Sequence, residues 1–163
     1  MPANAERNNL DSQRIELLGR NRLIDELLRA NLEVALPIRD RGIDLIAYVD
    51  LDSRVSKYTA RPIQMKAASA KSLAIDRKYE KFRGLIIAFV WDLNAEQRGA
   101  TYALTFEDLK SLADKWKWLS TDSWEKNGIY TTNQPSRHMI DDLEPHKMDK
   151  DKWWQLIAER ESV

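Results

Sequence analysis

Three polar side chains in two predicted neighbouring strands have types and spacing suited to chemistry on a phosphate. Asp44 lies within the apolar run 43–46, where a dry and unpaired carboxylate would cost several kcal/mol. Gln64 and Lys66 are two residues apart in the next predicted strand, so their side chains share one face of it. If the two strands pair as a hairpin, an acid, an amide oxygen and an ammonium group meet at one sheet edge. Such a set suits a hard cation and a phosphate.

A helix and three strands must position these residues, and the first half of the sequence predicts them. Residues 13–30 place leucines at helical spacing, which indicates an amphipathic helix. Residues 33–37 predict a short strand that ends at a proline, and residues 43–49 predict a strand of β-branched and apolar residues. Residues 62–67 supply the third strand, which carries the amide and the ammonium group.

The second half of the sequence predicts further strands and helices. Residues 85–91 are nearly all apolar, so we expect a strand buried on both faces, and residues 101–104 form another short strand. A helix is predicted from Thr105 to about Leu119, because Thr105 and Asp108 have the spacing of a helix start. Other elements are expected at residues 129–131 (a strand), 149–160 (a terminal helix) and 69–83 (a polar crossing segment).

This order of elements predicts an α/β sandwich built around a mixed sheet. We divide the chain into a flexible lead-in (1–10), a core (11–119) and a C-terminal extension that packs on the core (120–163). Five of the six tryptophans lie between residues 116 and 154. Because several of them fall on apolar helix faces, packing explains them better than stacking on bases.

The two predicted strands resemble the core of the PD-(D/E)xK nucleases, a superfamily that includes type II restriction enzymes and archaeal Holliday-junction resolvases. The run Gly42-Ile43-Asp44-Leu45 is followed, after a stretch of strand and turn, by Ile63-Gln64-Met65-Lys66. The order of the elements is also similar, and the match covers roughly residues 13–110. The resemblance implies a restriction-endonuclease-like α/β/α sandwich with a central mixed β-sheet, acting on DNA.

The resemblance also implies roles for the residues of the motif. Asp44, Gln64 and the main-chain carbonyl of Met65 would bind Mg²⁺ or Mn²⁺, and Lys66 would orient or activate the attacking water. Gln64 stands where the family usually has Asp or Glu, so one negative charge is missing from the metal site. Many relatives carry a glutamate on the first helix, and Glu16 is the best substitute for it here.

Further candidates come from the segment after the motif. Ser69, Lys71 and Ser72 are close enough in sequence to contact phosphate, although an ordinary polar loop explains them equally well. Tyr79 could line a nucleic-acid groove, and the alternative is a half-buried ring among solvated basic residues.

Structural alternatives also exist for the acidic residues. Asp44 could form a buried ion pair with Arg41 or Lys66 and serve stability alone. The neighbouring acids most simply form turns; they are Asp40, Asp50 and Asp52.

Composition limits the classes of function. The net charge is zero, which argues against a general polyanion binder, yet residues 1–83 carry 16 Lys and Arg against 12 Asp and Glu. That asymmetry permits a basic face. The absence of cysteine excludes thiolate metal sites and disulfides. No apolar run approaches the roughly 18 residues of a membrane span, and the first residues have no secretory signal, so we expect a cytoplasmic protein.

Three hypotheses follow from the sequence. The first is a metal-dependent endonuclease that hydrolyses DNA phosphodiester bonds, with a homodimer as one arrangement because such enzymes often pair to cut two strands. The second is a catalytically weakened module on the same fold that binds DNA or a protein. The third is an interaction protein without a nucleic-acid role, which the zero net charge permits.

Overall fold

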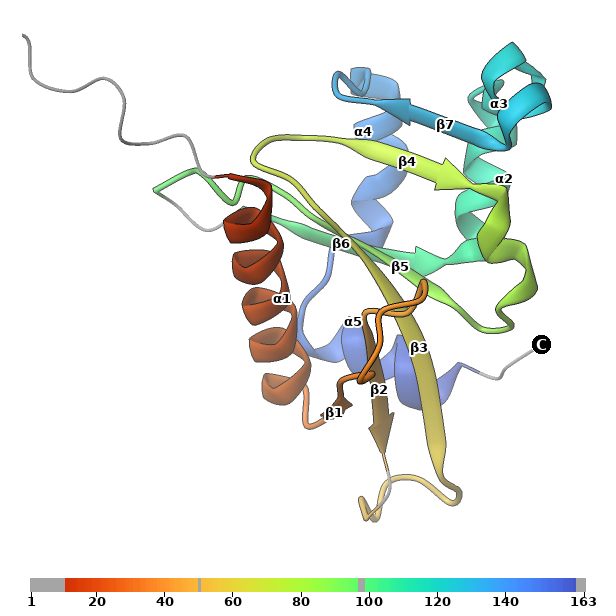
Figure 1. Cartoon of the computed structure of the whole chain (residues 1–163). Coiled ribbons are helices and arrows are strands. Elements are labelled where there is room, and N and C mark those ends of the chain that lie inside the picture. Colours follow the sequence, from red (N-terminus) through yellow and green to blue (C-terminus); the bar gives the residue numbers. More distant parts are fainter. Residues whose placement is uncertain (1–10, 50, 97–98, 161–163) are drawn as a thin grey trace, which may run out of the picture.

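The computed structural model describes residues 11–49, 51–96 and 99–160 (Figure 1). The expected lead-in 1–10 and the expected turn at Asp50 therefore lie outside the described residues. The central sheet has five strands in the order β1-β2-β3-β5-β6. Only β3 and β5 run parallel among these neighbours, so the sheet is mixed, as predicted. The strands are β1 (Glu33–Ala35), β2 (Leu45–Val49), β3 (Thr59–Ala67), β5 (Ile86–Val90) and β6 (Thr101–Thr105).

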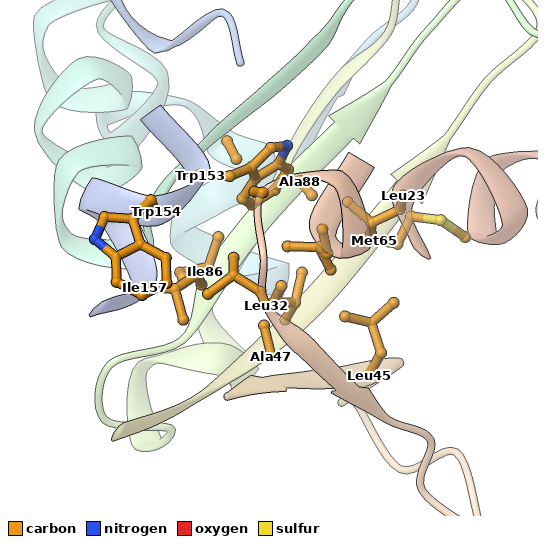
Figure 2. Close-up of a cluster of buried hydrophobic side chains, with 14 of the residues drawn as sticks. Leu23, Leu32, Leu45, Ala47, Met65, Ile86, Ala88, Trp153, Trp154 and Ile157 are labelled. Carbon is orange, nitrogen blue, oxygen red and sulfur yellow. The ribbon is translucent and has the colours of Figure 1, made fainter. Parts of the chain in front are cut away.

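One face of the central sheet is covered by helix α1 (Ser12–Arg29) and by the last helical segment of the described chain. This last segment consists of α5 (Lys150–Trp154) and a π-helical turn (Gln155–Glu159), whereas the sequence predicted one regular helix. Trp153 and Ile157 are fully buried there against α1 and the sheet (Figure 2). Burial of such large side chains contributes strongly to the hydrophobic stabilisation of the fold.

The other face carries a second, two-stranded sheet and several short helices. Strand β4 (Leu73–Asp76) pairs antiparallel with β7 (Ile129–Thr132), as seen at the top of Figure 1, and β4 contacts helix α2 (Phe106–Lys115). Between the central sheet and these elements lies a second hydrophobic core, in which Trp118 and Trp124 are both buried. The remaining elements on this face are the 3-10 turns η1 (Arg77–Lys81), η2 (Trp118–Ser120) and η3 (Glu144–His146), and the helices α2 (Phe106–Lys115), α3 (Asp122–Asn127) and α4 (Arg137–Leu143).

Several predicted boundaries are corrected by the structure. The segment 69–83 is not merely a polar crossing, since it contains β4 and η1. The helix predicted to reach Leu119 ends at Lys115, because Lys117 adopts a left-handed conformation with φ of 66°, which a right-handed helix does not accommodate. Helices α3 and α4 were not predicted at all. Among the described residues, no helix has both the length and the apolar character needed to cross a membrane.

Candidate functional site

The antiparallel pairing of β2 with β3 positions the three motif residues. In this pair Leu45 lies opposite Ile63, and β2 begins at Leu45 rather than at residue 43. Asp44 therefore lies one residue before the start of β2, beside the part of β3 that β2 does not cover. Its main-chain N–H donates to the carbonyl of Ile63 at 2.9 Å. The predicted hairpin is confirmed, and it brings Asp44 next to the Gln64–Lys66 segment.

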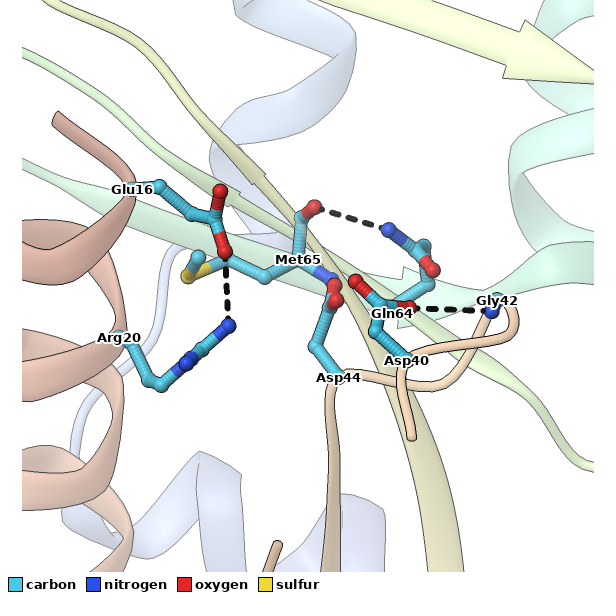
Figure 3. Close-up of polar contacts among 7 residues, drawn as sticks. All are labelled: Glu16, Arg20, Asp40, Gly42, Asp44, Gln64 and Met65. Atoms are coloured by element: carbon cyan, nitrogen blue, oxygen red, sulfur yellow. Dashed lines mark hydrogen bonds and ion pairs between the residues drawn. The ribbon is translucent and has the colours of Figure 1, made fainter. Parts of the chain in front are cut away.

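The carboxylate of Asp44 accepts a hydrogen bond from the main-chain N–H of Met65 at 2.6 Å (Figure 3). Met65 pairs with Ala88 of β5, and on the side of β3 that β2 no longer covers its N–H is satisfied by Asp44, which fixes the acid there. Burial raises the pKa of the Asp44 carboxyl, while the Met65 hydrogen bond and the positive charges of Arg20 and Lys66 oppose that rise. Asp44 was considered as an ion-pair partner of Arg41 or Lys66. Among the described residues, it forms neither ion pair.

Gln64 supplies an amide oxygen that has no partner. The side chain is 8% exposed, and its Nε2 donates to the carbonyl of Met65 at 3.2 Å. If the Gln64 amide were turned round, its Oε1 and the Met65 carbonyl oxygen would lie at this distance and repel each other. The hydrogen bond therefore fixes Nε2 as the end of the amide that faces Met65. Within the described part of the chain, the buried Oε1 finds no hydrogen-bond donor. Leaving a buried acceptor unpaired costs about 1–3 kcal/mol, and a donor or a cation beside this atom would remove that cost.

Lys66 lies on the same face of β3 as Gln64, as strand alternation predicts. Its ammonium group is 5.4 Å from the centre of the Tyr79 ring, an arrangement that stabilises a cation electrostatically. Burial and then the nearby charge of Lys78 lower the pKa of Lys66, while Asp44 partly offsets this effect. The opposite directions for Asp44 and Lys66 both reflect burial of the charged form.

A cavity of about 790 Å³ opens over these residues. Its walls are the first turns of α1 on one side and the ends of β4 and β7 on the other. All but one of the site residues expected from the sequence line it, namely Glu16, Asp44, Gln64, Met65, Lys66, Ser69, Lys71 and Ser72. The cavity therefore brings together segments that are far apart in the chain.

Tyr79 is the exception among the expected contacts. The ring is 4% exposed and belongs to the second core, where it packs at 6.3 Å from Phe82. It borders a separate, smaller cavity and not the main one. Its burial leaves little ring surface for stacking on a base, so the structure favours the alternative of a packed ring beside basic residues.

Glu16 is already engaged by a cation that sequence reasoning did not select. Its carboxylate accepts a hydrogen bond from Arg20 at 2.7 Å (Figure 3), and the Arg20 side chain is 30% exposed. The helix spacing of four residues explains the pair, and this spacing was the signal that could have identified it.

Other cavity residues were also missed by the sequence analysis. Asp40 lines the cavity, and its Oδ1 accepts from the main-chain N–H of Gly42 at 3.2 Å, so it is a turn residue, as expected, that also faces the cavity. Thr131 and Asn133 reach the wall through the pairing of β7 with β4. Ser72 donates to the side-chain oxygen of Asn133 at 3.1 Å. No local pattern indicates this contact, because it depends on pairing between distant segments.

The donor set of the cavity fits a hard divalent cation with few protein ligands. The available oxygens are the Asp44 carboxylate, the unpartnered Gln64 Oε1 and the Met65 carbonyl. The described residues contain no group of three His, Cys, Asp or Glu side chains arranged around one point, so a site of many charged ligands is not available. Mg²⁺ commonly uses one or two carboxylates and completes its shell with waters and substrate phosphate.

Family models, curated proteins and solved structures were compared with the chain, and none of them matches it. The fold is an α/β architecture with a mixed central sheet.

Proposed function

We propose that this chain is a restriction-endonuclease-like, metal-dependent nuclease domain that hydrolyses DNA phosphodiester bonds. The observation that carries the proposal is the unpartnered Oε1 of Gln64, which shares one cavity with Asp44 and Lys66. An orphaned buried oxygen beside a desolvated carboxylate suits a cation, and a half-buried lysine beside them suits a phosphate.

In this proposal, Asp44, Gln64 Oε1 and the Met65 carbonyl would hold Mg²⁺ or Mn²⁺. The ion, when bound, supplies charge stabilisation on the scissile phosphate and lowers the pKa of nearby water. Asp44 is held in place for this role by the N–H of Met65, so it needs little rearrangement. Preorganised groups of this kind contribute most to stabilising developing charge.

Lys66 has two tasks in the proposed reaction. Because burial lowers its pKa, it holds its proton less tightly than an exposed lysine and can exchange it with the attacking water nearer neutral pH. As an ammonium group, it stabilises the charge that develops on the phosphate oxygens. The Tyr79 ring beneath it limits where the Lys66 side chain can point.

A second candidate is a module on the same fold that binds DNA without cutting it. Two features favour it: Gln64 stands where the family that the motif resembles usually has an acid, and Arg20 donates to Glu16 and adds positive charge near Asp44. Both reduce the negative charge available to an ion. Retardation of DNA with no cleavage products would support this second candidate.

The test uses purified protein with plasmid, single-stranded and four-way-junction DNA, with Mg²⁺, with Mn²⁺ and with a chelator. We expect metal-dependent products, and Asp44→Ala and Lys66→Ala should each lower the rate at least about 100-fold. Asp122→Ala and Lys126→Ala are matched controls, because these residues form an exposed ion pair on α3 and should leave the rate unchanged. Full activity of both site variants, with unchanged thermal melting, would reject the assignment.

A further inference from the structure

A second cavity adjoins the main one and shares two of its residues. It has a volume of about 500 Å³, and both Asp40 and Gln64 line it as well as the main cavity. The two spaces therefore meet at the side chain whose oxygen lacks a partner. A ligand that extends past Gln64 enters the second cavity, whose other lining residues are Arg41, Gly42, Lys78, Tyr79, Lys81 and Phe82.

Positive charge predominates around the second cavity. Arg41, Lys78 and Lys81 line it, against the single acid Asp40. Lys78 is paired with Asp76 at 3.1 Å. For Arg41 and Lys81, the described residues provide no ion pair. Two exposed and unpaired cations in a concave surface are suited to an anionic ligand.

Each of the two lysines of this cavity lies near an aromatic ring. The Lys78 ammonium group is 5.0 Å from the centre of the Tyr79 ring, and that of Lys81 is 5.6 Å from the centre of the Phe82 ring. Lys66 is also near the Tyr79 ring, since its ammonium group is 5.4 Å from the centre of that ring. The Tyr79 ring is therefore close both to Lys66 of the main cavity and to Lys78 of the second cavity.

The turn that carries Arg41 is also fixed. Gly42 has φ of 99°, a conformation that favours glycine, and the Asp40 carboxylate accepts its main-chain N–H. A Cβ at Gly42 would lie 3.4 Å from the Tyr79 ring, so the turn packs directly on that ring. Arg41 is therefore presented to the cavity by a defined turn.

We propose that the second cavity is a phosphate-binding subsite for the nucleic-acid strand beside the phosphate that is cut, with Arg41, Lys78 and Lys81 as its cations. The inference rests on the proposed function, because it assumes that the main cavity holds the scissile phosphate. It identifies the substrate as a strand with at least one further phosphate on the second-cavity side. Contacts to phosphate fix the register of a strand without reading its sequence.

The test measures binding of wild-type protein in a chelator to single-stranded oligonucleotides that carry one uncharged methylphosphonate linkage at successive positions. The variant Arg41→Ala/Lys81→Ala is compared with Lys126→Ala/Arg137→Ala, which removes the same charge from residues that line neither cavity. We expect the salt dependence of binding, log K against log salt, to lose a slope of about 0.7 for each phosphate contact removed from a single strand. The control variant should retain the wild-type slope.

The position of the uncharged linkage makes the test specific. At one position, the uncharged linkage should weaken binding to the wild-type protein. The same linkage should have no further effect on binding to Arg41→Ala/Lys81→Ala, because that variant has already lost the phosphate contact. Equal effects of every linkage in both proteins, or an unchanged salt slope in the double variant, would overturn the subsite. If the wild type cuts DNA but the subsite test fails, the proposed function stands alone. If the subsite test succeeds but no substrate is cut, the binding module is supported instead.

Discussion

Replacement of Gly19 by alanine tests how closely helix α1 approaches the strand that carries the site. Gly19 is buried within α1, and by helix propensity alone an alanine there would stabilise the protein by about 0.5–1 kcal/mol. In the structure, however, a Cβ at Gly19 would lie 2.6 Å from Cβ of Ala67 and 3.3 Å from the sulfur of Met65. Carbon atoms in favourable contact are separated by about 3.5–4.0 Å, so the helix must move by roughly 1 Å.

The two effects have opposite signs, and overpacking should exceed propensity. Forcing a methyl group into a filled core costs about 1–3 kcal/mol, so we expect a net loss of about 1–2 kcal/mol. For a chain of this length, that corresponds to a fall in Tm of about 2–8 °C, measured by thermal unfolding in a chelator. The double variant Gly19→Ala/Ala67→Gly removes the opposing methyl group and should recover part of the loss. A Gly19→Ala protein that melts at or above the wild-type temperature would refute the close approach.

Two further predictions concern charge at the site. Asp44→Asn can still accept from the Met65 N–H, and it should raise the metal-free Tm, because burial raises the pKa of Asp44. The stability of the wild type should fall as the pH rises from the ordinary Asp pKa through the raised pKa of the folded protein. The Tm difference between Asp44→Asn and the wild type should therefore grow over that pH range. A Tm difference that does not change with pH would contradict the raised pKa of Asp44. Arg20→Gln removes a cation near Asp44 and releases Glu16, so calorimetry should show Mn²⁺ binding tightened about fivefold, roughly 1 kcal/mol; weaker binding would count against the proposed ion position.

The positions of Asp44, Gln64 and Lys66 could be predicted from the sequence, because they depend on the geometry of two consecutive strands. Strand alternation places Gln64 and Lys66 on one face, and the antiparallel pairing of two consecutive strands brings Asp44 beside them. Both rules act over short stretches of chain. The start of β2 at Leu45 was not predicted, because the apolar residue Ile43 continues the strand pattern although the pairing has already ended.

The rest of the cavity could not be predicted because it depends on pairing between distant segments. Strand β4 has only four residues, and its partner β7 lies more than fifty residues later. A short strand gains its stability from its neighbours rather than from its own residues, so its sequence carries a weak signal. For the same reason Thr131 and Asn133 were not identified, although both line the cavity.

On the proposed function, the balance of charge around Asp44 predicts that an ion and a nucleic acid depend on each other at this site. The Gln64 oxygen and the Met65 carbonyl are neutral ligands, and Lys66 and Arg20 both lower the pKa of Asp44 by their positive charge. A dication placed here alone would therefore have one carboxylate as a direct ligand, and it would meet the charge of Asp40 as well as two nearby cations. A phosphate from a bound strand brings negative charge to the same cavity and can complete the shell of a hard ion. Each ligand thus reduces the electrostatic cost of binding the other, and by linkage this coupling must be equal in both directions.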